Sequence, residues 1–205
     1  MKRLLQWLFA ASLAFAAGAI AAPAAVIDRV QGPAWVDRAG KEMPATPGTE
    51  LIVTDIVRTG ASARVYLRLG EGSTVKLGEN ARLALLDLTP ERGGVFRAVL
   101  DVVAGAFRFT TEAVQKPRKR DVKIRIATAT AGIRGTDLWG RATPEEEIVC
   151  LIEGRIEVAA PNEKPVVMAK PRQFYKRVKG KTQPLTVISA ARLAELARET
   201  EIDLR

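Results

Sequence analysis

Histidine is absent from this chain of 205 residues, and cysteine occurs once, at Cys150. A chain without histidine has no Ser–His or Cys–His catalytic dyad and no histidine-ligated metal, and a single cysteine forms neither an intrachain disulfide nor a cysteine zinc cluster. Aromatic residues are also few, at 5%, but hydrophobic residues reach 47% and can support a folded core. We therefore predict a folded protein that is not an enzyme, with no catalytic residues, no metal and no cofactor.

The first 21 residues have the pattern of a secretory signal peptide. Lys2 and Arg3 precede an apolar run, and Ala19-Ile20-Ala21 fits the small-residue pattern of a cleavage site. We predict that the signal peptide is cleaved after Ala21 and that the remainder is exported. The alternative is an uncleaved membrane anchor, because residues 4–26 are long enough to span a bilayer.

Basic residues outnumber acidic residues, 32 to 23. Loss of residues 1–21 removes two basic residues and lowers the formal charge from +9 to +7. A positive surface favours anionic partners such as lipopolysaccharide, a cell-wall polymer or an acidic protein face. Export argues against nucleic acid as a partner.

One segment concentrates basic side chains. It spans residues 112–121, contains a proline, and is typical of an exposed loop. Its candidate contact residues, for a partner or for an anionic polymer, are Lys116, Arg118, Lys119 and Arg120. A second basic segment at 170–181 is a further candidate for polymer binding.

The body of the chain alternates apolar and polar residues with period two, which is typical of β-strands. Clear runs are Val65–Leu69, Val122–Ile126 and Ile148–Ile152, and glycine-rich turns separate such runs. This pattern predicts an all-β domain over residues 22–188, built from short strands that stack as a solenoid-like body or as a sandwich. Within the last run, Cys150 is predicted to be a small buried residue.

Residues 189–205 depart from this pattern and predict one C-terminal α-helix and a tail. Ser189 can cap a helix from about Ala190 to Glu201. Leu193 and Leu196 share one face of this helix, so we expect it to pack on the β domain as a terminal cover. The alternatives are docking on a partner and fraying.

A local pattern of apolar residues around a glycine recurs at Gly32, Gly105 and Gly154. The glycines are separated by unequal intervals, so there is no fixed repeat length. The pattern indicates either three tight corners between strands, where glycine lets the backbone turn, or a coincidence common in β proteins.

One stretch is more specific than the rest: residues 126–138 contain Gly132-Ile133-Arg134-Gly135-Thr136 after an apolar strand. This stretch resembles the hallmark block of the FecR domain. Further pieces resemble the same family in chain order, at 48–51, 57–63, 67–78, 100–109 and 149–158. The resemblance covers about residues 26–160, with a motif core at 48–158.

The resemblance implies a periplasmic, non-catalytic β domain used in sensing or in protein and envelope contacts. Typical FecR regulators carry a cytoplasmic anti-sigma segment and a transmembrane helix before this domain. Here an export signal opens the sequence, so we expect no direct contact with a sigma factor. We predict a sensing or scaffold module that contacts another envelope protein. The alternative is binding of peptidoglycan or lipopolysaccharide through the basic loops, and no feature specifies an oligomeric state.

The hallmark block also has a physical interpretation as a structural motif. Gly132 and Gly135 flank Ile133-Arg134, so the backbone can make a tight turn there. The planar guanidinium of Arg134 can clamp carbonyls or a carboxylate, with Glu153 or Asp101 as possible partners and Thr136 closing the turn. The alternative is that Arg134 contacts a ligand.

Overall fold

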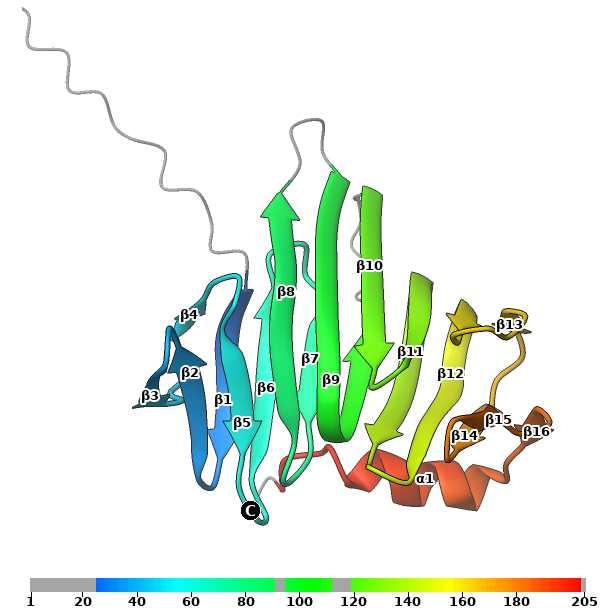
Figure 1. Cartoon of the computed structure of the whole chain (residues 1–205). Coiled ribbons are helices and arrows are strands. Elements are labelled where there is room, and N and C mark those ends of the chain that lie inside the picture. The colour runs from blue at the N-terminus through cyan, green and yellow to red at the C-terminus, as the bar shows by residue number, and fades with distance from the viewer. Residues whose placement is uncertain (1–24, 91–94, 112–118, 204–205) are drawn as a thin grey trace, which may run out of the picture.

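The computed structural model describes residues 25–90, 95–111 and 119–203 (Figure 1). This part of the chain contains sixteen strands and one C-terminal helix, and all the strands are hydrogen-bonded into one continuous sheet. The predicted all-β class with a C-terminal helix is confirmed. The predicted signal peptide, residues 1–21, lies outside the described residues. Within the described part, no helix has the length and apolar character needed to cross a membrane.

The sheet folds over on itself into two layers with the hydrophobic core between them. Layer one contains, in order, β4 (Glu50–Leu51), β1 (Ala25–Gln31), β6 (Arg64–Leu69), β7 (Thr74–Leu77), the second part of β9 (Val95–Thr110), the second part of β11 (Ala129–Ala142), the first part of β12 (Glu146–Ala159), β14 (Gln173–Val178), and beside it β15 (Lys181–Thr182) and β16 (Thr186–Val187). Layer two contains β3 (Lys41–Pro44), β2 (Ala34–Arg38), β5 (Ile56–Thr59), β8 (Arg82–Pro90), the first part of β9, β10 (Lys119–Ile126), the first part of β11, the second part of β12, and β13 (Val166–Met168).

Three strands belong to both layers because each bends at a glycine. β9 has 16 residues and bends at Gly105, while β11 and β12 have 14 residues each and bend at Gly135 and Gly154. The φ angles of these glycines are +85°, +61° and +92°, which residues with a Cβ rarely adopt. Hydrogen bonding continues on both sides of each bend, so stretches predicted as pairs of short strands are single long strands. The expectation of short strands throughout is corrected at these three places.

The bends lie at two opposite ends of the fold, because the second parts of β9 and β11 pair antiparallel with Gly105 opposite Ala142 and Thr110 opposite Asp137. Gly135 and Gly154 lie together at one end, and Gly105 lies at the other end with Gly32, which stands between β1 and β2 with a φ of +73°. A Cβ added at Gly32 would lie 3.1 Å from Ala63 Cα, and one at Gly105 would lie 2.5 Å from Ala81 Cα. A Cβ at Gly154 would lie 2.1 Å from a backbone oxygen of β11. These glycines are needed both for their dihedral angles and for the close approach of neighbouring turns. The recurring glycine pattern therefore marks tight corners.

The core contains the buried acidic residues Asp55 and Glu147. Asp55 is fully buried and accepts a hydrogen bond of 2.8 Å from Arg38 Nε. Glu147 is 8% exposed, accepts a hydrogen bond of 3.1 Å from Ala129 N, and pairs with the buried Arg177. Buried carboxylates persist when they are paired and hydrogen-bonded in this way. Glu147 thereby joins layer one to the turn between β10 and β11 in layer two.

β10 lies only in layer two, where it separates β9 from β11 and runs parallel to β9. It begins at Lys119, which pairs with Val95, so the end of the basic segment is a strand and not the loop that the sequence predicts. Pairing with β9 continues the main-chain hydrogen bonding that a loop would lack. Lys116 and Arg118 lie outside the described residues.

The helix α1 (Ala190–Arg198) packs on the outer face of layer one through a hydrophobic cluster. Figure 1 shows it near the lower ends of β11 and β12. The side chain of Ser189 accepts a hydrogen bond of 3.1 Å from Arg192 N, as expected of an N-cap. Leu196 is 1% exposed and packs in a second hydrophobic cluster with Trp139 and Cys150. The predicted cover is confirmed, although the helix ends at Arg198 rather than at Glu201.

Candidate interaction surface

The hallmark residues lie on β11, on both sides of its bend. Gly132 is in regular strand pairing with Lys123 of β10 and Glu157 of β12, and its φ is not positive. Only Gly135 adopts the left-handed conformation. The tight turn predicted between the two glycines is therefore wrong, because main-chain pairing with both neighbours keeps the stretch extended up to the bend.

Thr136 fixes the bend of β11 to its neighbours. Its N–H donates to Thr111 Oγ1 at 2.8 Å, and its carbonyl accepts from Thr111 N at 2.9 Å. Its hydroxyl, in a side chain only 2% exposed, donates to Arg155 O at 3.3 Å. Thr136 therefore holds the bend at Gly135 to the residue after β9 and to β12, rather than closing a turn between Gly132 and Gly135. The side chain of Arg134 lies outside the described part, so its role as a clamp with Glu153 or Asp101 stays a prediction.

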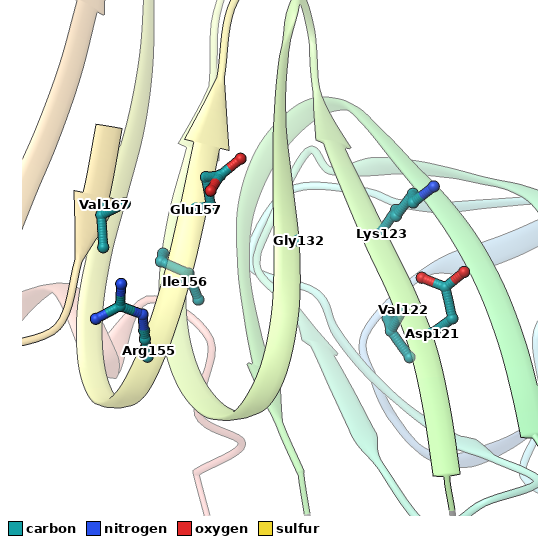
Figure 2. Close-up of a pocket in the computed structure, with 8 residues that line it drawn as sticks. All are labelled: Asp121, Val122, Lys123, Gly132, Arg155, Ile156, Glu157 and Val167. Carbon is teal, nitrogen blue, oxygen red and sulfur yellow. The ribbon is translucent and has the colours of Figure 1, made fainter. Parts of the chain in front are cut away.

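An open groove lies on the outer face of layer two, over β10, β11, β12 and β13 (Figure 2). Its volume is about 320 Å³. One row of paired positions crosses it, from Lys123 through Gly132 and Glu157 to Val167. Asp121 and Arg155 line it beside this row. We call it the Gly132 groove.

The groove exists because position 132 has no side chain. A Cβ added at Gly132 would meet no atom within 4 Å, so packing does not require glycine there. The dihedral angle does not require it either. Glycine inside a strand costs about 0.5–1 kcal/mol relative to alanine. The fold thus carries a weakening residue whose visible effect is the open space above it.

Charges of both signs border the groove and are not paired with each other. Neither the ammonium of Lys123, nor the guanidinium of Arg155, nor the carboxylate of Glu157 has an ion pair or side-chain hydrogen bond within the described residues. Lys123 and Glu157 lie two strands apart, which separates their backbones by about 10 Å. Val167, at 42% exposure, adds an apolar side chain at the edge. The arrangement suits a segment of another protein that carries complementary charges.

The second basic segment, 170–181, is only partly available for an anionic ligand. Lys176 Nζ lies 2.6 Å from Glu146 Oε2, and Arg177 is 7% exposed and paired with Glu147. Phe174 packs with the α1 cluster and Tyr175 with the main core, so the two rings face opposite sides of β14. They form no exposed stacking surface of the kind that binds single-stranded nucleic acid.

Cys150 has the properties of a structural residue. It is fully buried under α1, as predicted, and burial raises the pKa of its thiol to about 11. A thiol with so high a pKa is a poor nucleophile near neutral pH. Among residues 25–90, 95–111 and 119–203, no group of three His, Cys, Asp or Glu side chains is placed to hold a metal ion.

Two structural features were missed by sequence reasoning. The buried pair of Glu147 and Arg177 was hidden because each lies in a run of charged residues that reads as solvent-exposed. The contacts of Glu201 were hidden because its partners, Tyr66, Lys76 and Arg108, are distant in sequence. One signal in the sequence could have found the buried pair of Glu147 and Arg177. Glu147 has the same strand phase as Val149 and Leu151, so it lies on the same face of β12 as these two apolar residues.

The sequence profile of the FecR protein family matches residues 55–157, about half of the chain. The chain belongs to the FecR family. The match lies within the predicted motif core and includes the corner glycines of β9, β11 and β12. It also includes Gly132 and every residue that lines the groove except Val167.

Two solved structures share the fold of this FecR domain. Both are of a proposed anti-sigma factor from Parabacteroides distasonis ATCC 8503, at 1.65 and 2.50 Å resolution. Each has a TM-score of 0.54 and 14% sequence identity, and the match covers 68% of this chain and 62% of the other. The matched region is thus less than two thirds of that protein, and at this identity the likeness shows the fold alone. The comparison with curated protein sequences gave no match.

Proposed function

We propose that this FecR-domain protein is a non-enzymatic sensing or scaffold module that contacts another protein of the cell envelope through the Gly132 groove. The observation that carries the proposal is the glycine at position 132. Neither backbone geometry nor packing explains it, whereas an occupant of the groove does. The partner segment would place an acidic group near Lys123 or Arg155 and a basic group near Glu157.

We propose further that the protein acts in the periplasm after cleavage behind Ala21, and that its contacts are regulatory. The signal-peptide pattern supports export. FecR membership and the fold shared with a proposed anti-sigma factor support regulation. Fractionation of cells and N-terminal sequencing test the first point. The mature chain should begin at Ala22, and a full-length chain in the cytosol would contradict export.

The groove is tested by site-specific photocrosslinking in intact cells. A photoreactive residue replaces Val167 at the groove, and the matched control replaces Val187 on β16, which is 61% exposed. We expect a discrete crosslink to one envelope protein from position 167 and none from position 187.

A second variant decides whether the groove itself is used. Gly132→Val places a side chain in the groove, and its Cβ would meet no atom within 4 Å, so the protein should stay folded while the crosslink from position 167 is lost. An unchanged crosslink in the folded variant, or equal crosslinks from both positions, would contradict the proposal.

Binding of an anionic envelope polymer is a second candidate. It is favoured by the exposed Lys170, Arg172, Lys179 and Lys181, which surround β14 and β15. Co-sedimentation with purified peptidoglycan, and with lipopolysaccharide, at low and high salt tests it. Electrostatic polymer binding should weaken strongly as the salt concentration rises. Salt-sensitive co-sedimentation that Gly132→Val leaves unchanged would support the polymer over the groove.

A further inference from the structure

The residues after α1 lie on the outer face of layer one as a short tail that begins with turns, in which the N–H groups of residues 199–201 donate to the carbonyls three residues before them. Glu199 contacts Arg141 of β11, with 2.6 Å between Oε2 and Nη2. Further along, the Ile202 N–H donates to Tyr66 Oη at 2.7 Å. The Asp203 N–H donates to Gln31 Oε1 at 3.1 Å. The tail pairs with no strand, so side chains of layer one hold it.

Glu201 has the densest contacts in this tail. Its carboxylate accepts hydrogen bonds from Tyr66 Oη at 2.9 Å, from Lys76 Nζ at 2.7 Å and from Arg108 Nη1 at 3.0 Å. These donors come from three strands, β6, β7 and β9. Charge-assisted hydrogen bonds of this kind are stronger than neutral ones. Two of these donors, Lys76 and Arg108, form with Arg141 a cationic row that spans three strands, β7, β9 and β11.

The cationic row does not depend on the tail for its own structure. Arg108 is already paired with Asp137 through two contacts, Nε–Oδ1 at 3.0 Å and Nη2–Oδ2 at 2.7 Å. The guanidinium of Arg141 lies 5.1 Å from the centre of the Trp139 ring, a distance typical of cation–π contact. Without the tail, these cations would face water, where a positive charge is well solvated. The face is therefore a complete surface to which the tail is added.

The tail places acidic residues at every second position, 199, 201 and 203, and two of them meet cations of the row. We infer that the outer face of layer one is a recognition surface for an acidic segment of a partner protein, with carboxylates two residues apart, and that the tail occupies it in the free protein. A chain with a formal charge of +7 after cleavage suits such a partner. The inference does not depend on the Gly132 groove, which lies on the other layer.

The test uses the full chain and a labelled peptide with the sequence of residues 199–205. In the variant Glu199→Gln/Glu201→Gln, the tail loses its ion pairs and should leave the row. Fluorescence anisotropy should then show about tenfold tighter peptide binding than for the unaltered chain. The reason is that the few partly exposed ion pairs of Glu199 and Glu201 together change a dissociation constant by about a factor of ten. A peptide with glutamine in place of its acidic residues should not bind.

Matched lysine variants locate the binding. Lys76→Gln in the tail-released background should abolish peptide binding, whereas Lys123→Gln, on the other layer, should leave it unchanged. Circular dichroism confirms that each variant is folded, and limited trypsin cleavage after Arg198 reports release of the tail.

Several results would overturn the inference. They are a tail that stays protected in the double variant, equal peptide affinity for the released and unaltered folded chains, and equal binding of the neutral peptide. A concentration-dependent dimer that exchanges tails would assign the surface to a second copy of the chain instead of a partner. Gly132→Val should not change peptide binding. The peptide experiment therefore tests this inference even if the groove proposal fails.

Discussion

The two layers of this FecR domain share a core, but their outer faces differ. Layer one presents Trp139 and Cys150, both fully buried, beneath α1, and the tail continues the cover. Layer two presents Lys123, Arg155 and Glu157 to water, with nothing above Gly132. An apolar outer face needs a cover in water, whereas a charged one does not. The chain uses its last residues on the first face and leaves the second available for contact.

The largest expected effect comes from weakening the contact between α1 and the outer face of layer one. Leu196→Ala removes the buried anchor of α1 and should lower the free energy of unfolding by about 3 kcal/mol. The matched change Val167→Ala, on the bare layer, should cost less than about 0.5 kcal/mol. Urea denaturation measures both.

The same pair of variants has a second measurement. A thiol reagent should label Cys150 much faster in Leu196→Ala than in the unaltered chain, because the cover over the thiol loosens. Equal stability losses for Leu196→Ala and Val167→Ala, or an unchanged labelling rate, would show that α1 is not a stabilising cover.

On the uncovered outer face of layer two, we expect a substitution to change the free energy of unfolding by a smaller amount and to increase it. Gly132→Val should raise the free energy of unfolding by about 0.5 kcal/mol, since valine favours strands and its Cβ would meet no atom within 4 Å. Gly154→Val is the matched control on the adjacent strand, and it should prevent folding because its Cβ would lie 2.1 Å from Gly135 O. Melting temperature and soluble yield compare the two variants. Destabilisation by Gly132→Val would mean that the glycine has a structural role.

The smallest expected effect is a loosening of the tail in acid. Burial alone would raise the pKa of Glu201, but hydrogen bonds from Lys76 and Tyr66 and the charges of Lys76 and Arg108 lower it below its ordinary value of 4.5. A carboxyl whose pKa is lower in the folded state stabilises that state above its unfolded pKa. This contribution is lost as pH falls through the folded pKa.

The tail contact should therefore be complete above about pH 4.5 and weaken at lower pH. The amide chemical shift of Ile202, which donates to Tyr66, reports this contact in a pH titration. The step should be absent in Glu201→Gln. A step of equal size in that variant would assign the change to another group.

The strand pattern and the corners were accessible to sequence reasoning, because both depend on local chemistry. Alternation marked the strands, and the residues around Gly32, Gly105 and Gly154 marked the corners. Prediction from the local sequence is wrong at Gly132 and Gly135, since two glycines three residues apart suggest one turn. The structure gives them different roles, because pairing with β10 and β12 keeps Gly132 extended.

The candidate surfaces were less accessible. The groove needs residues from β10, β11, β12 and β13, and their alignment depends on strand register. The cationic row needs Lys76 and Arg108 to lie beside a tail that follows them by more than 90 residues in the chain. Neither contact leaves a periodic signal in the sequence.

By itself, the sequence determined the all-β class, the capped C-terminal helix, the family and the positions where the chain must turn, because dihedral preference and alternation act over a few residues. Only the tertiary structure decided that three glycine-bent strands serve both layers, that Glu147 and Arg177 are buried together, and which outer face is covered. Those outcomes depend on which distant strands become neighbours, and that is settled by burying one shared core.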